Sequence, residues 1–199
     1  MNFLFHLYLS GDDPDLLTGN LMGDFIKGRV GEQYPPRLRD GIVLHRRIDT
    51  FAQSHPLFRQ SKRRIDPAFG HWRGVLVDMY YDHFLADEWS CWSQETFETY
   101  LERSRRMVEN NQAYFPERMR GMLPVIFETL LPSYRTLEGV GLALERMSAR
   151  IRRSNPLADG VRELQRNRVE LRNDFREFIP HVQKYVADFL TGSIVNHCI

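Results

Sequence analysis

Cysteine is scarce in this chain of 199 residues, and long apolar runs are missing altogether. Its two cysteines, Cys91 and Cys198, are far apart and lack metal-ligand spacing, so the sequence predicts neither a disulfide framework nor a zinc knuckle. This usage is typical of a cytoplasmic protein. No stretch approaches the ~20 apolar residues that cross a bilayer. The apolar segment 1–9 has no basic n-region and is interrupted by His6, so we expect neither a signal peptide nor a membrane partner.

A surplus of charge of one sign is also lacking, because 27 basic residues face 26 acidic ones and the net charge is +1. Nonspecific binding of nucleic acid is therefore not expected. The charges are nevertheless uneven, with basic runs at 62–64, 103–106 and 146–153. Each run is either a solvated helix face or a surface that attracts an acidic partner.

Alternating strand patterns are the third absence, and almost every segment has helical periodicity instead. We predict an all-α fold, a compact bundle of about seven or eight helices in a single domain that spans residues 1–199. Asp13 before Pro14 indicates a helix start, and Pro180 is expected to kink the last helix. The core-facing candidates of that helix are Leu164, Leu171, Phe175 and Phe178. The predicted helices cover residues 14–28, 36 to at least 49, 56–66, 75–89, 93–110, 118–131, 134–153 and 157–190.

Imidazoles and carboxylates, by contrast, recur through the first 83 residues. His45 and Asp49 lie one turn apart, so both side chains would project from one helix face. Imidazole suits transition metals, and carboxylate oxygens suit hard cations. The pair would therefore supply two metal ligands at a nearly fixed separation. The alternative is an ordinary ion pair that stabilises the helix surface.

Asp78 and Asp82, followed by His83, form a second pair within an apolar segment. Two ionised carboxylates one turn apart repel each other, and burial adds a desolvation cost. A bound cation relieves both costs, although arginine partners would do the same. With His6 in the apolar N-terminal segment, these residues predict a divalent-metal site inside a helical bundle, and hence a metal-dependent hydrolase.

Asn20 and Asp24 are also one turn apart, and Gly19 and Gly23 accompany them. Glycine inside a helix costs about 1 kcal/mol relative to alanine. Two glycines in one turn therefore indicate that a packed helix or a ligand approaches the backbone closely.

Arginines accompany the candidate ligands. Arg46 and Arg47 lie between His45 and Asp49, and Arg150 follows much later in the chain. Because guanidinium groups match phosphate oxygens, we predict that these arginines bind an anion. The alternatives are pairing with nearby carboxylates for Arg46 and Arg47, and a solvated face for Arg150. No serine lies in a nucleophile elbow, so covalent catalysis is not predicted.

Four ordered segments within about the first 90 residues resemble the acyl carrier protein phosphodiesterase family. They are Asn2-Phe3-Leu4-x-His6, Gly19-Asn20-Leu21-x-x-Asp24-Phe25, His45-Arg46-Arg47-Ile48-Asp49 and Asp78-x-x-Tyr81-Asp82-His83-Phe84-Leu85. The later segment Met147-Ser148-x-Arg150 resembles the family more loosely. The resemblance implies an all-helical fold distantly related to the HD-domain metal-dependent phosphohydrolases.

The resemblance also implies an activity. The reaction is hydrolysis of the phosphodiester that joins 4′-phosphopantetheine to a serine of acyl carrier protein, with a divalent cation expected to be Mn²⁺. The implied metal ligands are His6, Asp24, His45, Asp49, Asp78 and Asp82. The implied catalytic residues are Asp24, His45, Asp49, Asp82 and His83, and the implied substrate-binding residues are Arg46, Arg47 and Arg150.

The implied substrate protein is acidic and helical, so Lys62, Arg63 and Arg64 form a hypothetical docking patch. Two other functions fit the same residues. One is an HD-like phosphohydrolase that acts on a nucleotide or another small phosphodiester and needs no docking surface. The other is a noncatalytic helical module that binds carrier protein or another acidic partner. The fold alone does not distinguish them.

Overall fold

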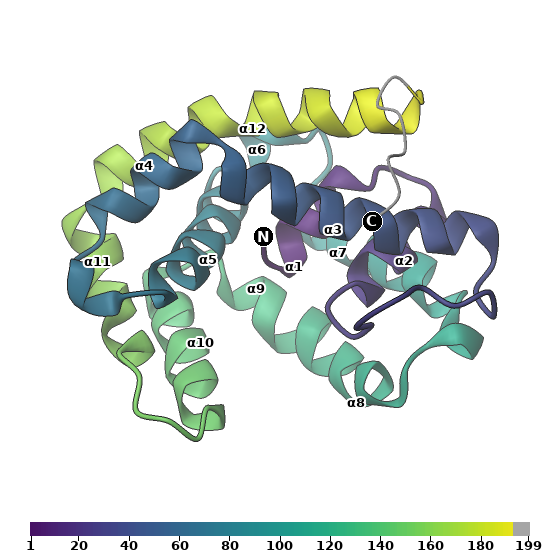
Figure 1. Cartoon of the computed structure of the whole chain (residues 1–199), viewed down its shortest axis with the longest axis horizontal. Coiled ribbons are helices and arrows are strands. Elements are labelled where there is room, and N and C mark those ends of the chain that lie inside the picture. Colours follow the sequence, from purple (N-terminus) through teal and green to yellow (C-terminus); the bar gives the residue numbers. More distant parts are fainter. Residues whose placement is uncertain (193–199) are drawn as a thin grey trace.

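The computed structural model describes residues 1–192, and its ordered elements within that range are all helices (Figure 1). The predicted all-α class is therefore confirmed. The α-helices are α1 (Phe3–Leu9), α2 (Pro14–Met22), α3 (Pro36–Ser54), α4 (Pro56–Arg64), α5 (Trp72–Asp87), α6 (Trp89–Trp92), α7 (Phe97–Glu109), α8 (Glu117–Val125), α9 (Leu131–Ser133), α10 (Leu137–Arg150), α11 (Gly160–Arg166) and α12 (Arg168–Leu190). Four single-turn elements join them: η1 (Pro67–Phe69), η2 (Gln112–Tyr114), the π-helical η3 (Ile126–Leu130) and η4 (Leu157–Asp159). None of the helices in residues 1–192 is long and apolar enough to span a membrane.

Helix α2 starts where the sequence predicts and ends earlier. The Asp13 side chain accepts hydrogen bonds from the backbone N–H groups of Asp15 and Leu16, and Pro14 takes the first helical position. The helix ends at Met22 rather than near Gly28, because the chain turns at Gly23. The segment after this turn carries Asp24 toward α3.

Helices α2 and α3 pack with their backbones in contact, and Gly19 makes this possible. A Cβ atom at Gly19 would lie 2.1 Å from the carbonyl oxygen of Leu38 and 2.9 Å from the Cα of Gly41. Such distances are far below ordinary carbon contacts. The close approach expected from the glycines is therefore confirmed, and at Gly19 a packed helix accounts for it.

The last predicted helix, 157–190, is divided in the structure. It consists of η4, α11 and α12, with Asn167 between the two α-helices. Helix α12 runs along one side of the molecule, across α4 and α3 (Figure 1). Pro180 lies inside α12, and helix continues on both sides of it. The four predicted core residues are fully buried: Leu164, Leu171, Phe175 and Phe178.

Helix α1 is short, and buried side chains from two other helices hold it in place. The Asp82 carboxylate on α5 accepts hydrogen bonds from the backbone N–H groups of Leu4 (2.9 Å) and Phe5 (3.0 Å). Asn20 on α2 donates to the carbonyl oxygen of His6 (3.0 Å) and to the hydroxyl of Ser10 (2.8 Å). These contacts fix the direction of the His6 ring, which α1 presents to α3.

Candidate metal centre

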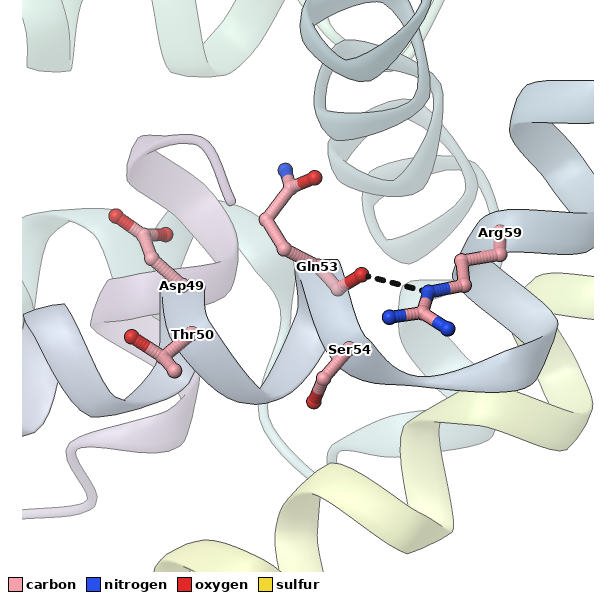
Figure 2. Close-up of a pocket in the computed structure, with 5 residues that line it drawn as sticks. All are labelled: Asp49, Thr50, Gln53, Ser54 and Arg59. Atoms are coloured by element: carbon pink, nitrogen blue, oxygen red, sulfur yellow. Dashed lines mark hydrogen bonds between the residues drawn. The ribbon is translucent and has the colours of Figure 1, made fainter.

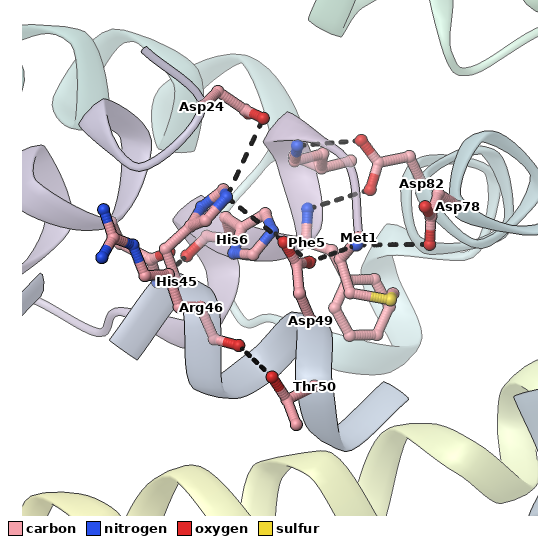
Figure 3. Close-up of polar contacts among 12 residues, drawn as sticks. Met1, Phe5, His6, Asp24, His45, Arg46, Asp49, Thr50, Asp78 and Asp82 are labelled. Atoms are coloured by element: carbon pink, nitrogen blue, oxygen red, sulfur yellow. Dashed lines mark hydrogen bonds and ion pairs between the residues drawn. The ribbon is translucent and has the colours of Figure 1, made fainter. Parts of the chain in front are cut away.

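His6, His45 and Asp49 come together between α1 and α3 (Figure 3). The Nε2 of His6 lies 3.3 Å from one carboxylate oxygen of Asp49, and the Nε2 of His45 lies 3.4 Å from the other. Three ligands around an ion at ~2.1 Å would be separated by about 3.0–3.4 Å in octahedral or tetrahedral geometry. The separations of the two nitrogens from the Asp49 oxygens agree with that spacing.

The protonation states of these three residues also suit a cation. Burial and the neighbouring His6 ring lower the pKa of His45 to about 3, and burial lowers the pKa of His6. Burial alone would raise the pKa of Asp49, but the contacts with His6 and the Met1 amino group hold it well below its usual range. Two neutral imidazoles and one ionised carboxylate are the forms that bind metal.

Neither ring nitrogen of His6 makes a well-aligned hydrogen bond within the described residues, although the side chain is 1% exposed. Buried polar atoms are normally satisfied by hydrogen bonds. A ring nitrogen that binds a metal ion needs no hydrogen-bond partner, so a role as metal ligand would explain why His6 is an exception. Two histidines and one carboxylate that leave coordination positions open suit Mn²⁺, Fe²⁺ or Zn²⁺.

The His45 ring is held between two neighbours. It stacks on the His6 ring, with centroids 3.9 Å apart and an angle of 19° between the planes. Gly23 is the second neighbour, and it approaches the ring so closely that a Cβ atom there would lie 2.2 Å from the Cγ of His45. The absence of a side chain at Gly23 therefore makes room for this imidazole.

The amino group of Met1 lies beside the cluster and pairs with two carboxylates. It is 2.6 Å from Asp49 and 3.2 Å from Asp78. Burial would lower the pKa of this amino group, but Asp78 and Asp49 raise it to about 11. Burial raises the pKa of Asp78 to about 6, against the opposing effect of the amino group. The sequence pattern gave no sign of this cation, because it belongs to the backbone.

The Met1 amino group therefore offsets the cost of burying Asp78, and two backbone N–H groups offset the cost of burying Asp82. Within residues 1–192, the contacts of these two carboxylates include no arginine. Burial raises the pKa of Asp82 to about 8, although its two N–H donors oppose the shift. Through these two hydrogen bonds, Asp82 holds α1 against α5.

Asp24 stands at the open edge of the cluster. Its carboxylate is 3.8 Å from the Nε2 of His45, and burial raises its pKa. The side chains of Asp24 and Asp49 are 38% and 41% exposed, whereas those of His6 and His45 are 1% and 6% exposed. A substrate would therefore approach the centre from the carboxylate side.

His83 faces away from this arrangement. Its Nδ1 lies 2.7 Å from the carbonyl oxygen of Tyr134, and burial lowers its pKa. Consecutive residues on a helix point in different directions, so Asp82 and His83 cannot both face α1. The structure brings His83 to Tyr134 and not to the cluster of His6, His45 and Asp49, and its catalytic role stays a prediction.

The three predicted anion-binding arginines lie in different places. Arg46 donates from Nη2 to the carbonyl oxygen of Ile26 (3.2 Å), beside the segment that carries Asp24. Arg47 is partly buried on α3. Arg150 is exposed at the C-terminal end of α10, and Figure 1 shows that end at the lower edge of the molecule, away from α1 and α3.

An open surface pocket of about 420 Å³ adjoins the cluster. Asp49 lies at one end and Arg59 at the other, as Figure 2 shows. Between them, the exposed side of α3 lines the pocket with Thr50, Gln53 and Ser54. The sequence gives no signal for these three polar residues, because they match no motif. The fold and the cluster together define an all-helical protein with a candidate two-histidine, one-carboxylate metal centre.

Comparisons with known proteins identify the family. Residues 1–182 match the family described as acyl carrier protein phosphodiesterase. The chain is 28% identical over 186 residues to the acyl carrier protein phosphodiesterase of Pectobacterium atrosepticum, covering 92% of this chain and 96% of that protein. It is 30% identical over 204 residues to the protein of the same name from Klebsiella pneumoniae, covering 92% and 96%. No solved structure matches the chain. The chain belongs to the acyl carrier protein phosphodiesterase family, which confirms the resemblance of its four segments.

Proposed function

We propose that this protein hydrolyses the phosphodiester that joins 4′-phosphopantetheine to a serine of acyl carrier protein. Water is consumed, the serine hydroxyl is regenerated, and 4′-phosphopantetheine leaves as a phosphomonoester. The observation that carries the proposal is the meeting of His6, His45 and Asp49, because His6 comes from one family motif, His45 and Asp49 come from another, and the two motifs converge on one point. A cytoplasmic location is part of the same proposal.

His6, His45 and Asp49 would hold a divalent cation, which we propose to be Mn²⁺. When bound, the cation supplies positive charge at a phosphoryl oxygen and lowers the pKa of a water molecule. Asp24 would receive or return a proton at the open edge, a role supported by its partly exposed carboxylate beside His45. Arg46, which donates to the carbonyl oxygen of Ile26 two residues after Asp24, would stabilise negative charge on phosphate.

The test is incubation of the purified protein with holo carrier protein and Mn²⁺, with and without chelator, followed by intact-protein mass spectrometry. We expect the carrier protein to lose the mass of 4′-phosphopantetheine only when the metal is available. The matched variants are Asp49→Asn, which keeps the shape but removes the charge at the centre, and Asp159→Asn, which removes an exposed carboxylate on the η4 element. We expect Asp49→Asn to lose activity and Asp159→Asn to keep the activity of the wild type.

Absence of 4′-phosphopantetheine release with any divalent metal would refute the proposal. Hydrolysis of small phosphodiesters in the same samples would then favour the HD-like alternative. Binding of carrier protein without hydrolysis would favour the noncatalytic module.

A further inference from the structure

Helix α4 carries cations that have no carboxylate partner within residues 1–192. Arg59, Lys62 and Arg63 are spaced i, i+3 and i+4, so they share one face of the helix. We call these three residues the α4 basic face. Phe58 and Ser61 are buried on the opposite side.

The contacts of the α4 basic face are with neutral groups. The Nε of Arg59 donates to the backbone carbonyl of Gln53 (3.2 Å), and the Nζ of Lys62 lies 3.4 Å from the side-chain oxygen of Gln53. Within residues 1–192, none of the three cations has a carboxylate partner. Their charge is therefore available to an acidic surface from outside.

Arg64 does not belong to this face, which corrects the docking patch expected from the sequence run. Its guanidinium makes two hydrogen bonds to the buried carboxylate of Asp174, at 2.7 and 3.0 Å. Asp174 also accepts from Ser61 and Gln60. Arg64 thus fastens α4 to α12, and its charge is already neutralised.

The position of the α4 basic face relates it to the candidate centre. Arg59 forms the far end of the pocket that begins at Asp49 (Figure 2). Lys62 and Arg63 follow one turn later on the same helix. A protein seated on this face would thus lie beside the pocket, and a group projecting from it could extend along α3 to Asp49.

We propose that the α4 basic face is the docking surface for the acidic helical surface of the carrier protein, whose phosphodiester-linked arm then enters the adjoining pocket. This inference rests on the proposed function. Charge complementarity at the edge of an interface acts mainly on encounter rate and salt dependence. The α4 basic face would therefore determine how well carrier protein binds, and it would not alter the chemical step.

The experiment compares Lys62→Glu/Arg63→Glu with Arg152→Glu/Arg153→Glu. The control pair is exposed just beyond the C-terminal end of α10. Both double variants therefore change the net charge by the same amount, and both lie near the C-terminal end of a helix. Binding of apo carrier protein is measured by fluorescence anisotropy, which needs no hydrolysis. KM and kcat are measured separately with holo carrier protein, at low salt and at 0.5 M salt as a screening condition, where the ~4–5 Å Debye length suppresses exposed ion pairs.

We expect Lys62→Glu/Arg63→Glu to weaken binding and to raise KM about tenfold at low salt, with kcat unchanged and with the difference shrinking at high salt. The control pair should match the wild type. Equal behaviour of both variants would overturn the docking surface and leave the proposed function intact. Binding of carrier protein by this face without any hydrolysis would overturn the proposed function and leave the docking surface intact. If the α4 variant instead lost affinity for a single-stranded RNA probe while retaining carrier protein, the docking proposal would be wrong.

Discussion

Gly23→Ala should disable the candidate centre without adding a polar group. The new Cβ atom would lie 2.2 Å from the Cγ of His45 and 2.5 Å from its Cβ and Cδ2. Ordinary carbon contacts are about 3.5–4.0 Å, so the imidazole must retreat by roughly 1.3 Å. Because its ring is stacked on His6, such a shift changes its distance to Asp49.

The size of the effect follows from that displacement. Overpacking of this kind costs about 1–3 kcal/mol of stability, and a ligand misplaced by about 1 Å can lower catalytic rates by roughly 100-fold. We expect the affinity for Mn²⁺ to fall at least about tenfold, as when the support of a metal ligand is removed. The measurements are isothermal titration calorimetry with Mn²⁺ and release of 4′-phosphopantetheine.

The matched control is Gly121→Ala in α8, where a Cβ atom would meet nothing within 4 Å. This substitution should leave metal binding unchanged and should stabilise the helix by up to about 1 kcal/mol. If Gly23→Ala bound Mn²⁺ as tightly as the wild type and Gly121→Ala, the assignment of His45 as a ligand would be refuted.

Three further outcomes are expected. Asp82→Ala leaves the buried N–H groups of Leu4 and Phe5 without acceptors, so the free energy of unfolding in urea should fall by about 2–4 kcal/mol, and a fall below about 1 kcal/mol would contradict the role of Asp82 in holding α1. His45 in the apo protein should cost stability as the pH falls below about 6.5, because the imidazole takes up a proton there in the unfolded chain and the buried ring, with its pKa of about 3, does not; a His45→Gln variant should therefore lose less stability than the wild type between pH 7 and 5, and parallel thermal-unfolding profiles would oppose this. Gly19→Ala should separate α2 from α3 and lower the free energy of unfolding by about 1–3 kcal/mol, which urea titration with an unchanged m-value would verify.

Sequence reasoning succeeded where local spacing determines the outcome. The one-turn separation of His45 and Asp49 places both on one face of α3, and His6, which the sequence also indicated as a ligand, meets them there. The glycines correctly indicated close approach. Gly19 meets the backbone of α3, and Gly23 meets the His45 ring.

The rest depends on contacts between distant segments. Asp78 and Asp82 have the same spacing as the ligand pair, yet their partners are the Met1 amino group and the N–H groups of α1. A carboxylate whose partner belongs to the backbone leaves no trace in the pattern of side chains. Likewise, the sequence of residues 62–64 indicates one basic patch. In the structure, however, Arg64 is paired with the buried Asp174 on α12, a residue 110 positions away in the chain. The HD-like relationship and the single domain stay predictions.

The attachment of α1 has a consequence for the order of events during synthesis. Leu4 and the Asp82 carboxylate that receives its N–H are separated by 78 positions in the chain. At ~5–20 residues per second, a ribosome adds those residues in roughly 4–16 s. A seven-residue helix is not stable by itself in water. The first histidine of the candidate centre therefore emerges from the ribosome long before its neighbours, and the growing chain must wait for α5 before it can assemble the site.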